Sequence, residues 1–587
     1  MFQANVEHLQ RPLYSTLDDL TVKGRARLEK SWAGTFYTEV FMRLAEQPFA
    51  VLYAAADSRP NTPVNVLVGL EILKSGNGWC DEELYDHFSY DVQVRYALGY
   101  RNLGDGEFTL RTLYNFRQRL SQHMQATGEN LLDAAFAQVT GQQMAAFQVH
   151  STRLRMDSTQ IASDIRETSR LQLLVEVLQR VARLLAETDD QAYAAILAPY
   201  VQGSAGQYLY RLQPAERPRQ LEVIGSVMQQ LVAGLAPQYE QAAAYQVLVR
   251  VFGEHFVWTA TEQRSKLAAE LSARSLQSPD DLEATFRRKQ GASYRGYAAN
   301  VTETCDPDNP LQLVVLVQTA PNAMDDGQFL VEAVPDLVER TAVEHITTDG
   351  GYNGPEPANV LAAAHIEHEQ TAIRGGKPLA DGLQLADFSF TYTDQDILTT
   401  LTCPQAQTAA VKPGRQADRF IVHFDATLCA ACPLRQLCPA TRQRDNQQPV
   451  LYLTQRALHV AQQRQQLKQH HTRFNVRAAI EATVRSLVHP LPHDKAPVRG
   501  LFRVASYMLA SAFMVNLRRI HHYCRRQQQE RAVATASAAP IAARDLVFYA
   551  LSRLLAPLVV LLQHFFGSFI PQQAAARLEP WGAAASC

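Results

Sequence analysis

The segment LRMDSTQI, residues 154–161, decides the prediction of the fold. Apolar and polar residues alternate from Arg153 to Asp157, which is typical of a strand with one buried face. From 160 to about 290 the sequence instead has the Gln- and Leu-rich pattern of long helices, and strand patterns resume only near 294. The chain is therefore predicted to place a helical insertion directly after its first core strand.

The sequence after the insertion alternates strands and helices. The segment 294–305 turns at 306–310 and returns as LQLVVLVQT, whose apolar residues on both faces predict a central strand. A helix at 325–341 leads to a short strand that ends at Asp349, and another helix and short strand follow. This order predicts an α/β fold with a mixed sheet that begins as a meander and continues through right-handed crossovers.

Composition and charge narrow the class of protein. The 587 residues are 47% hydrophobic and 19% charged, which excludes a disordered, collagenous or disulfide-scaffold chain. The net charge is −2, yet residues 441–531 contain sixteen Lys and Arg against four acids, an excess of 12 that leaves −14 elsewhere. So dense a basic block favours a polyanionic partner, although a solvated helical face is the alternative. The N-terminus lacks the pattern of a signal peptide, so a cytoplasmic location is expected.

Three carboxylates stand out by position. Asp157 lies on the first strand, and Asp349 ends a later strand and precedes two glycines, at a kind of position where α/β sheets bind ligands. Glu481 is the only acid between Asp445 and Asp494. Salt bridges to arginines one turn away would explain Glu481 by itself. Two Asp on adjacent strands and a Glu on a covering helix would instead form an oxygen-ligand site for Mg²⁺ or Mn²⁺. Two such ions about 4 Å apart can cleave a phosphodiester.

These motifs resemble those of the insertion-sequence DDE transposases, whose catalytic core is RNase H-like. LRMDSTQI resembles the strand of the first Asp, and TTDGGYNG resembles the Asp-x-Gly-Tyr motif of the second. FNVRAAIE is similar to the Tyr-x2-Arg-x3-Glu-x6-Lys signature, with Phe474 in place of Tyr, Arg477 and Glu481 matching, and Val488 in place of Lys. The flanking helical segments extend the resemblance to roughly residues 20–525.

The resemblance implies a DNA transposase that binds the terminal inverted repeats of its element and catalyses metal-dependent strand cleavage and strand transfer. Asp157, Asp349 and Glu481 would be catalytic and would hold Mg²⁺ or Mn²⁺, with two ions expected. Double-stranded DNA, as transposon ends and target, and a second copy of the chain in a homodimer would be its partners. A catalytically inactive DNA-binding protein on the same fold and a generic RNase H-like nuclease are the alternatives. The residues expected to contact DNA are Arg473, Phe474, Arg477 and Arg485 near the third acid, and Arg111, Arg117 and Arg119 on an N-terminal helix.

The full prediction is an RNase H-like mixed sheet with an all-α N-terminal domain and two insertions. Its segments are a helical DNA-binding domain (1–145), the first strand of the catalytic core (146–159), a helical insertion (160–290), the continued core (291–380), a β- and loop-rich insertion with a cysteine cluster (381–455), a basic helical end of the core (456–530), and a linker with an apolar C-terminal helix (531–587).

The cysteine cluster contains a single Cys-x2-Cys pair. Cys429, Cys432 and Cys438 follow one another closely, with Cys403 upstream, so a structural zinc site and reduced buried thiols are both open. The apolar stretch 545–570 is interrupted by Arg553, Pro557 and His564 before it could span a bilayer. It is therefore predicted to be a core or interface helix, and no membrane partner is expected.

Overall fold

The computed structural model describes residues 1–10, 12–54, 60–188, 191–289, 291–371, 382–393, 397–416, 418–443, 448–469, 476–492 and 495–538. Two compact units are present, Met1–Ile520 and His521–Cys587.

The first 147 residues are helical, as predicted. An amphipathic helix, α6, buries Leu113, Phe116 and Leu120 and ends at Gly128, whose φ of 79° is a left-handed conformation that favours glycine. These side chains share a core with the other N-terminal helices and with the first part of a C-terminal helix. The helices are α1 (Val22–Glu29), α2 (Trp32–Glu39), α3 (Val64–Asn77), α4 (Asp81–Tyr90), α5 (Val92–Ala97), α6 (Leu110–Thr127) and α7 (Leu131–Phe147).

The central sheet is mixed, as expected for the α/β class. Its strands are β1 (Arg153–Ala162), β4 (Thr285–Lys289), β5 (Ala292–Thr304), β6 (Val314–Pro321), β7 (His345–Thr348) and β8 (Glu367–Gln370). The strand β5 is antiparallel to β1 on one side and to β4 and β6 on the other, and β7 runs parallel to both β1 and β8. The helices α13 (Asp326–Arg340) and α14 (Pro355–Ala363) connect β6 to β7 and β7 to β8.

The prediction that LQLVVLVQT forms a central strand is wrong. In the described part of the sheet, β6 pairs only with β5. Its apolar residues are explained by helices, because α7 and α13 pack against it. Asn516 covers the outer edge at Val314, accepting from its N–H (2.8 Å) and donating to its carbonyl (2.9 Å).

The insertion after β1 has its own hydrophobic core, built from residues such as Leu178, Met228 and Leu248. Its helices are α8 (Arg170–Glu187), α9 (Ala194–Leu197), α10 (Ala205–Arg211), α11 (Arg217–Tyr239) and α12 (Ala243–His255). Helix was predicted up to 290, but a hairpin of β2 (Phe256–Trp258) and β3 (Gln263–Ser265) follows α12, and β4 joins the main sheet. Strands of three to five residues are too short to show a clear period in sequence.

The segment predicted to be β- and loop-rich forms a second antiparallel sheet in the order β13-β14-β12-β11-β10-β9. Phe388, Leu401, Val422 and Leu453 are part of a separate small core there. The strands are β9 (Ser389–Tyr392), β10 (Leu398–Thr402), β11 (Thr408–Pro413), β12 (Arg419–His423), β13 (Thr441–Arg442) and β14 (Pro449–Thr454), with the short helix α15 (Ala426–Ala430) between β12 and β13.

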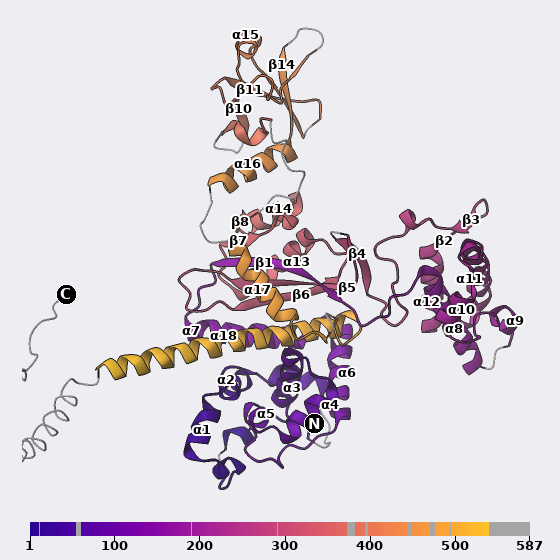
Figure 1. Cartoon of the computed structure of the whole chain (residues 1–587), viewed down its shortest axis with the longest axis vertical. Coiled ribbons are helices and arrows are strands. Elements are labelled where there is room, and N and C mark those ends of the chain that lie inside the picture. The colour runs from indigo at the N-terminus through magenta and orange to yellow at the C-terminus, as the bar shows by residue number, and fades with distance from the viewer. Residues whose placement is uncertain are drawn as a thin grey trace, which may run out of the picture. The chain divides into compact units, whose positions relative to one another are not determined.

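Three helices follow among the described residues: α16 (Gln455–Gln469), α17 (Val476–Val488) and α18 (Leu501–Ala538). Figure 1 shows α17 beside β1 and β7, the two strands against which it packs. The Ala-rich segment predicted to be a linker from 531 is helical up to Ala538, where it continues α18, because alanine has the highest helix propensity. The apolar stretch 545–570 lies outside the described residues. Among the helices that are described, none is long and apolar enough to cross a membrane.

Candidate functional site

Asp157 and Asp349 occupy equivalent positions on neighbouring strands. In the parallel pair β1–β7, Arg153 pairs with His345 and Arg155 with Thr347, an offset of 192 residues. Asp157 and Asp349 are separated by the same 192 positions. Continued two residues past the paired segment, this register sets the two aspartates opposite one another, on strands spaced about 4.8 Å apart. Asp349 directly follows the end of β7, whereas Asp157 is inside β1, which continues to Ala162 along β5.

Alternation along β1 tells which face of the sheet Asp157 occupies. Leu154 and Met156 pack with α13 and α14 in one core, while Ile161 belongs to the core shared with α17 and α18. Side chains on a strand alternate between faces, so Arg155 and Asp157 share the face of Ile161. Asp157 therefore lies on the side of the sheet where α17 packs.

Backbone hydrogen bonds hold both carboxylates. Asp349 Oδ1 accepts from the Gly351 N–H at 2.7 Å, and Asp157 Oδ1 accepts from the Ser158 N–H at 2.9 Å. A Cβ atom on Gly351 would lie 2.8 Å from Asp349 Oδ1 and 2.7 Å from Asp326 Oδ2. Only glycine fits between these oxygens, which explains the residue type two positions after Asp349.

A third aspartate, Asp326, lies near these strand ends. From the sequence it was placed only within the helix predicted at 325–341. Asp326 is the first residue of α13, is 8% exposed, and accepts from Ser158 Oγ at 2.8 Å. The pKa of the fully buried Tyr352 is raised well above its usual value. Burial is the main cause, and the negative charges of Asp326, Asp157 and Asp349 raise the pKa further. Its position in the loop-to-helix turn after β6, five residues beyond the end of that strand, was the available signal.

The third predicted catalytic acid lies on α17. Ile480, Thr483 and Leu487 form its buried face, and Glu481 and Arg485 are exposed on its flank. The described residues hold no group of three His, Cys, Asp or Glu side chains placed to share one metal ion. Carboxylate oxygens suit Mg²⁺ or Mn²⁺ chemically, and the elements that carry the three acids are in contact.

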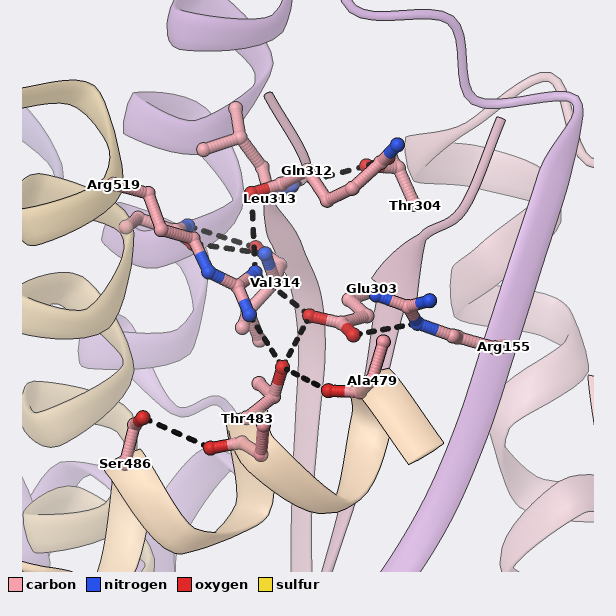
Figure 2. A network of polar contacts seen from close by, with 12 residues as sticks. Arg155, Glu303, Thr304, Gln312, Leu313, Val314, Ala479, Thr483, Ser486 and Arg519 are labelled. Carbon is pink, nitrogen blue, oxygen red and sulfur yellow. Dashed lines mark hydrogen bonds and ion pairs between the residues drawn. The ribbon is translucent and has the colours of Figure 1, made fainter. Parts of the chain in front are cut away.

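A buried charge network joins α17 to the sheet (Figure 2). Glu303 on β5 is 0% exposed, and its two oxygens contact Arg155 Nε at 2.6 Å and Arg519 Nη1 at 2.7 Å. The hydroxyl of Thr483 on α17 donates to Glu303 Oε2 at 2.8 Å and is itself contacted by Arg519. Sequence reasoning missed Glu303, because the segment AANVTET that carries it mixes apolar and polar residues and gives no local sign that its acid is buried.

The predicted DNA-contacting arginines are placed differently from one another. Arg117 is engaged within the N-terminal domain, donating to Glu71 at 2.7 Å and to Asp81 at 2.8 and 3.0 Å. Burial opposes both shifts, yet Glu71 and Asp81 raise the pKa of the guanidinium, and Arg117 and Lys74 lower that of Asp81 to about 2. Arg117 thus links three helices of the N-terminal domain, and its DNA-binding role stays a prediction. Arg111 and Arg119 are exposed, and Arg119 lies over the Tyr53 ring.

The predicted contacts around the third acid are only partly described. Arg485 is exposed, as a phosphate contact requires. The backbone of Arg477 lies in α17, but the structure does not describe its side chain. Arg473 and Phe474 lie outside the described residues. Their DNA-binding roles stay predictions.

The four clustered cysteines line one cavity of about 300 Å³ in the second sheet region. Burial raises the pKa of the Cys429 and Cys438 thiols, and the other sulfurs of the cluster contribute in the same direction. Cys403 and Cys432 complete the lining. Within the described residues the four are not close enough together to hold a metal, so zinc and reduced thiols both remain open.

Comparison with known proteins supports the resemblance. Residues 402–521 match the family model described as a transposase DDE domain, a region that contains Glu481 and the four cysteines. This match confirms the recognition of a DDE transposase over that part of the chain. No curated protein sequence matches.

A solved structure is also similar, the piggyBac transposase in a cryo-EM synaptic complex with hairpin DNA. The identity is 7%, the match covers 88% of this chain and 83% of that one, and the TM-score is 0.26. A TM-score this low does not establish a common fold.

Proposed function

We propose that this protein is a DDE-type DNA transposase that binds the terminal inverted repeats of its element and cleaves and transfers DNA strands. The observation that carries the proposal is the parallel register of β1 and β7, which sets Asp157 opposite Asp349 when it is continued by two residues, beside the helix that bears Glu481. The strand order β6-β5-β1-β7-β8, with the first three antiparallel and the last three parallel, supports an RNase H-like core.

In the proposed mechanism, Asp157, Asp349 and Glu481 would hold two Mg²⁺ or Mn²⁺ ions. Such ions activate a water or a 3′-hydroxyl and stabilise the leaving oxygen at a phosphodiester. The backbone N–H groups of Ser158 and Gly351 keep the two aspartates oriented. Exposed arginines such as Arg485 would bind the DNA backbone, whose charge the carboxylates alone would repel. No covalent enzyme–DNA intermediate is required.

The proposed partners are double-stranded DNA, as transposon ends and target, and a second copy of the chain. The basic block 441–531 favours the DNA partner, since twelve excess positive charges are concentrated in 91 residues. The homodimer and the cytoplasmic location are expectations carried by the resemblance and the sequence.

The test is cleavage of a labelled duplex that ends in the terminal repeat of the element, in Mg²⁺ or Mn²⁺. We expect cleavage at the repeat end, followed by joining of the released 3′ end to a second duplex. A duplex of the same composition with a scrambled repeat is the control and is expected to stay intact. End binding without cleavage would identify an inactive DNA-binding relative, and cleavage of both duplexes without joining would identify a generic nuclease.

We also propose that Cys403, Cys429, Cys432 and Cys438 bind one structural zinc ion, which requires the sulfurs to contract around their shared cavity. Purified protein is expected to contain about one zinc per chain by metal analysis, because tetrahedral zinc takes four such ligands. The double variant Cys429→Ser, Cys432→Ser should lose it, while Cys80→Ser, outside the cavity, should keep it. Zinc-free protein with four reactive thiols would show that the cluster is simply reduced.

A further inference from the structure

We propose that Glu303 is a positioning residue that, through Thr483, fixes helix α17 on the sheet and so sets Glu481 relative to Asp157. This inference rests on the proposed function, since it concerns the geometry of the same three carboxylates. Nothing in the resemblance assigns a role to Glu303 or to its partners.

The contacts of Glu303 join three elements of the fold, β1, α17 and α18. Arg155 is directly opposite Glu303 in the antiparallel pair β1–β5, and its Nε donates to Oε1 at 2.6 Å. Oε2 accepts from Thr483 of α17 at 2.8 Å and from Arg519 of α18 at 2.7 Å. Figure 2 shows these side chains converging on the one carboxylate.

Two members of this network, Arg155 and Thr483, each lie two residues from a proposed catalytic acid in the sequence. Arg155 precedes Asp157 by two residues on β1 and shares its face of the sheet. Thr483 follows Glu481 by two residues on α17. A rotation or shift of α17 that moved Glu481 would therefore break the Thr483–Glu303 hydrogen bond.

Directional bonds distinguish this network from ordinary packing. The other buried side chains of α17, such as Ile480 and Leu487, are apolar, and apolar contacts do not specify one helix rotation. The Thr483 hydroxyl donates to Glu303, approaches the Ala479 carbonyl at 3.3 Å and accepts from Arg519, so its position is defined from three sides. Arg519 is in turn held by the Gln312 carbonyl at 3.0 Å.

The charge balance explains why the carboxylate must stay paired. An ionised group that is 0% exposed is stable only with hydrogen-bonded counter-charges, and Glu303 has two guanidinium partners and one hydroxyl. The same pairing makes the network rigid, because any displacement of α17 leaves part of a buried charge without a partner.

The test removes the link between α17 and Glu303 while leaving both arginine pairs in place. Thr483→Val keeps the shape of the side chain and deletes its hydroxyl. We expect the rate of cleavage at the repeat end to fall about 10-fold, the range of groups that orient metal ligands, with end binding unchanged. Thr483→Ser, which retains the hydroxyl, should restore most of the rate.

Ser486→Ala is the matched control on the same helix. Its hydroxyl is exposed and donates only within α17, to the Ala482 carbonyl at 2.9 Å. Cleavage by this variant should equal that of the wild type. If Thr483→Val is not recovered folded, Thr483→Ala removes the same hydroxyl with a gain in helix propensity.

A second readout does not depend on turnover. Binding of Mn²⁺ to the DNA-free protein, followed by electron paramagnetic resonance, should be about 10-fold weaker in Thr483→Val than in Thr483→Ser or Ser486→Ala. A purely structural role of Thr483 would lower the melting temperature and leave the Mn²⁺ affinity unchanged.

The outcomes separate this inference from the proposed function. Wild-type cleavage and Mn²⁺ affinity in Thr483→Val would overturn the positioning role alone. Equal losses in Thr483→Val and Thr483→Ser would also overturn it, because the hydroxyl would not matter. A wild-type protein that neither cleaves its repeat end nor binds Mn²⁺ would refute the proposed function, and this inference with it.

Discussion

Replacement of Asp157 or Asp349 by Ala is expected to lower the rate of strand cleavage at the repeat end by at least about 10³-fold. Metal ions contribute several kcal/mol of transition-state stabilisation, and each 1.36 kcal/mol is a factor of ten in rate. The register of β1 and β7, continued two residues, sets the two carboxylates opposite one another, so in the proposed site the loss of either one would remove half of the oxygen ligands from this part of the fold. Single-turnover cleavage of the labelled repeat end measures the effect.

Glu481→Ala is expected to have the same effect, because its helix packs on both aspartate strands. Binding of the repeat end by all three variants should stay within about threefold of the wild type. Asp164→Ala is a suitable control, since this exposed acid contacts only Arg499 among the ion pairs of the described residues. Cleavage that survives Glu481→Ala would contradict the assignment of the third acid and point to Asp326, whose carboxylate lies beside Asp349.

Replacement of Glu303 by Ala is expected to lower the free energy of unfolding by about 3–5 kcal/mol, the usual cost of removing one partner from a buried ion pair. The loss leaves Arg155 and Arg519 as like charges in a buried site without their shared anion. The measurement is the shift in the unfolding transition of the sheet region in denaturant, followed by a probe in that region.

Glu303→Gln should give a smaller loss, because the amide oxygen can still accept from Thr483 while the negative charge is gone. Glu332→Ala is the matched control, since this glutamate is exposed on α13 and should change stability by no more than about 0.5 kcal/mol. A loss below about 1 kcal/mol in Glu303→Ala would mean that the network does not stabilise the sheet.

The sequence predicted the strands that carry or precede the two candidate aspartates, because their patterns are encoded locally. The alternation around Asp157 and the glycines after Asp349 are visible within ten residues, and both marked the correct strands. Glu303 could not be found in this way, because its partners Arg155, Thr483 and Arg519 are 148, 180 and 216 residues away. No sequence window contains such a network, and only the folded sheet brings it together.

Errors in the predicted fold have related physical causes. A strand that is apolar on both faces can be central or can be an edge covered by helices, and β6 is of the second kind within the described sheet. The ion pairs of Arg117 with Glu71 on α3 and Asp81 on α4 were likewise not visible from its position off the apolar face of α6. Both outcomes depend on neighbours distant in the chain.

The way the helical insertion is joined to the sheet has a consequence for folding. The chain leaves β1 after Ala162, which pairs with Gly296, and Ser163 and Tyr297 both hydrogen-bond to the buried Asp281, at the far end of the insertion. Ser163 and Asp281 are 118 residues apart, so closing this loop from an unfolded chain carries a large entropic cost that rises only slowly with length. Because the insertion has its own core, its earlier folding would hold the two ends together before β1 pairs with β5. The pairing of β1, which carries Asp157, with β5 would then join segments that are already close together. Its rate would depend on how fast the helical insertion folds and not on the length of the loop.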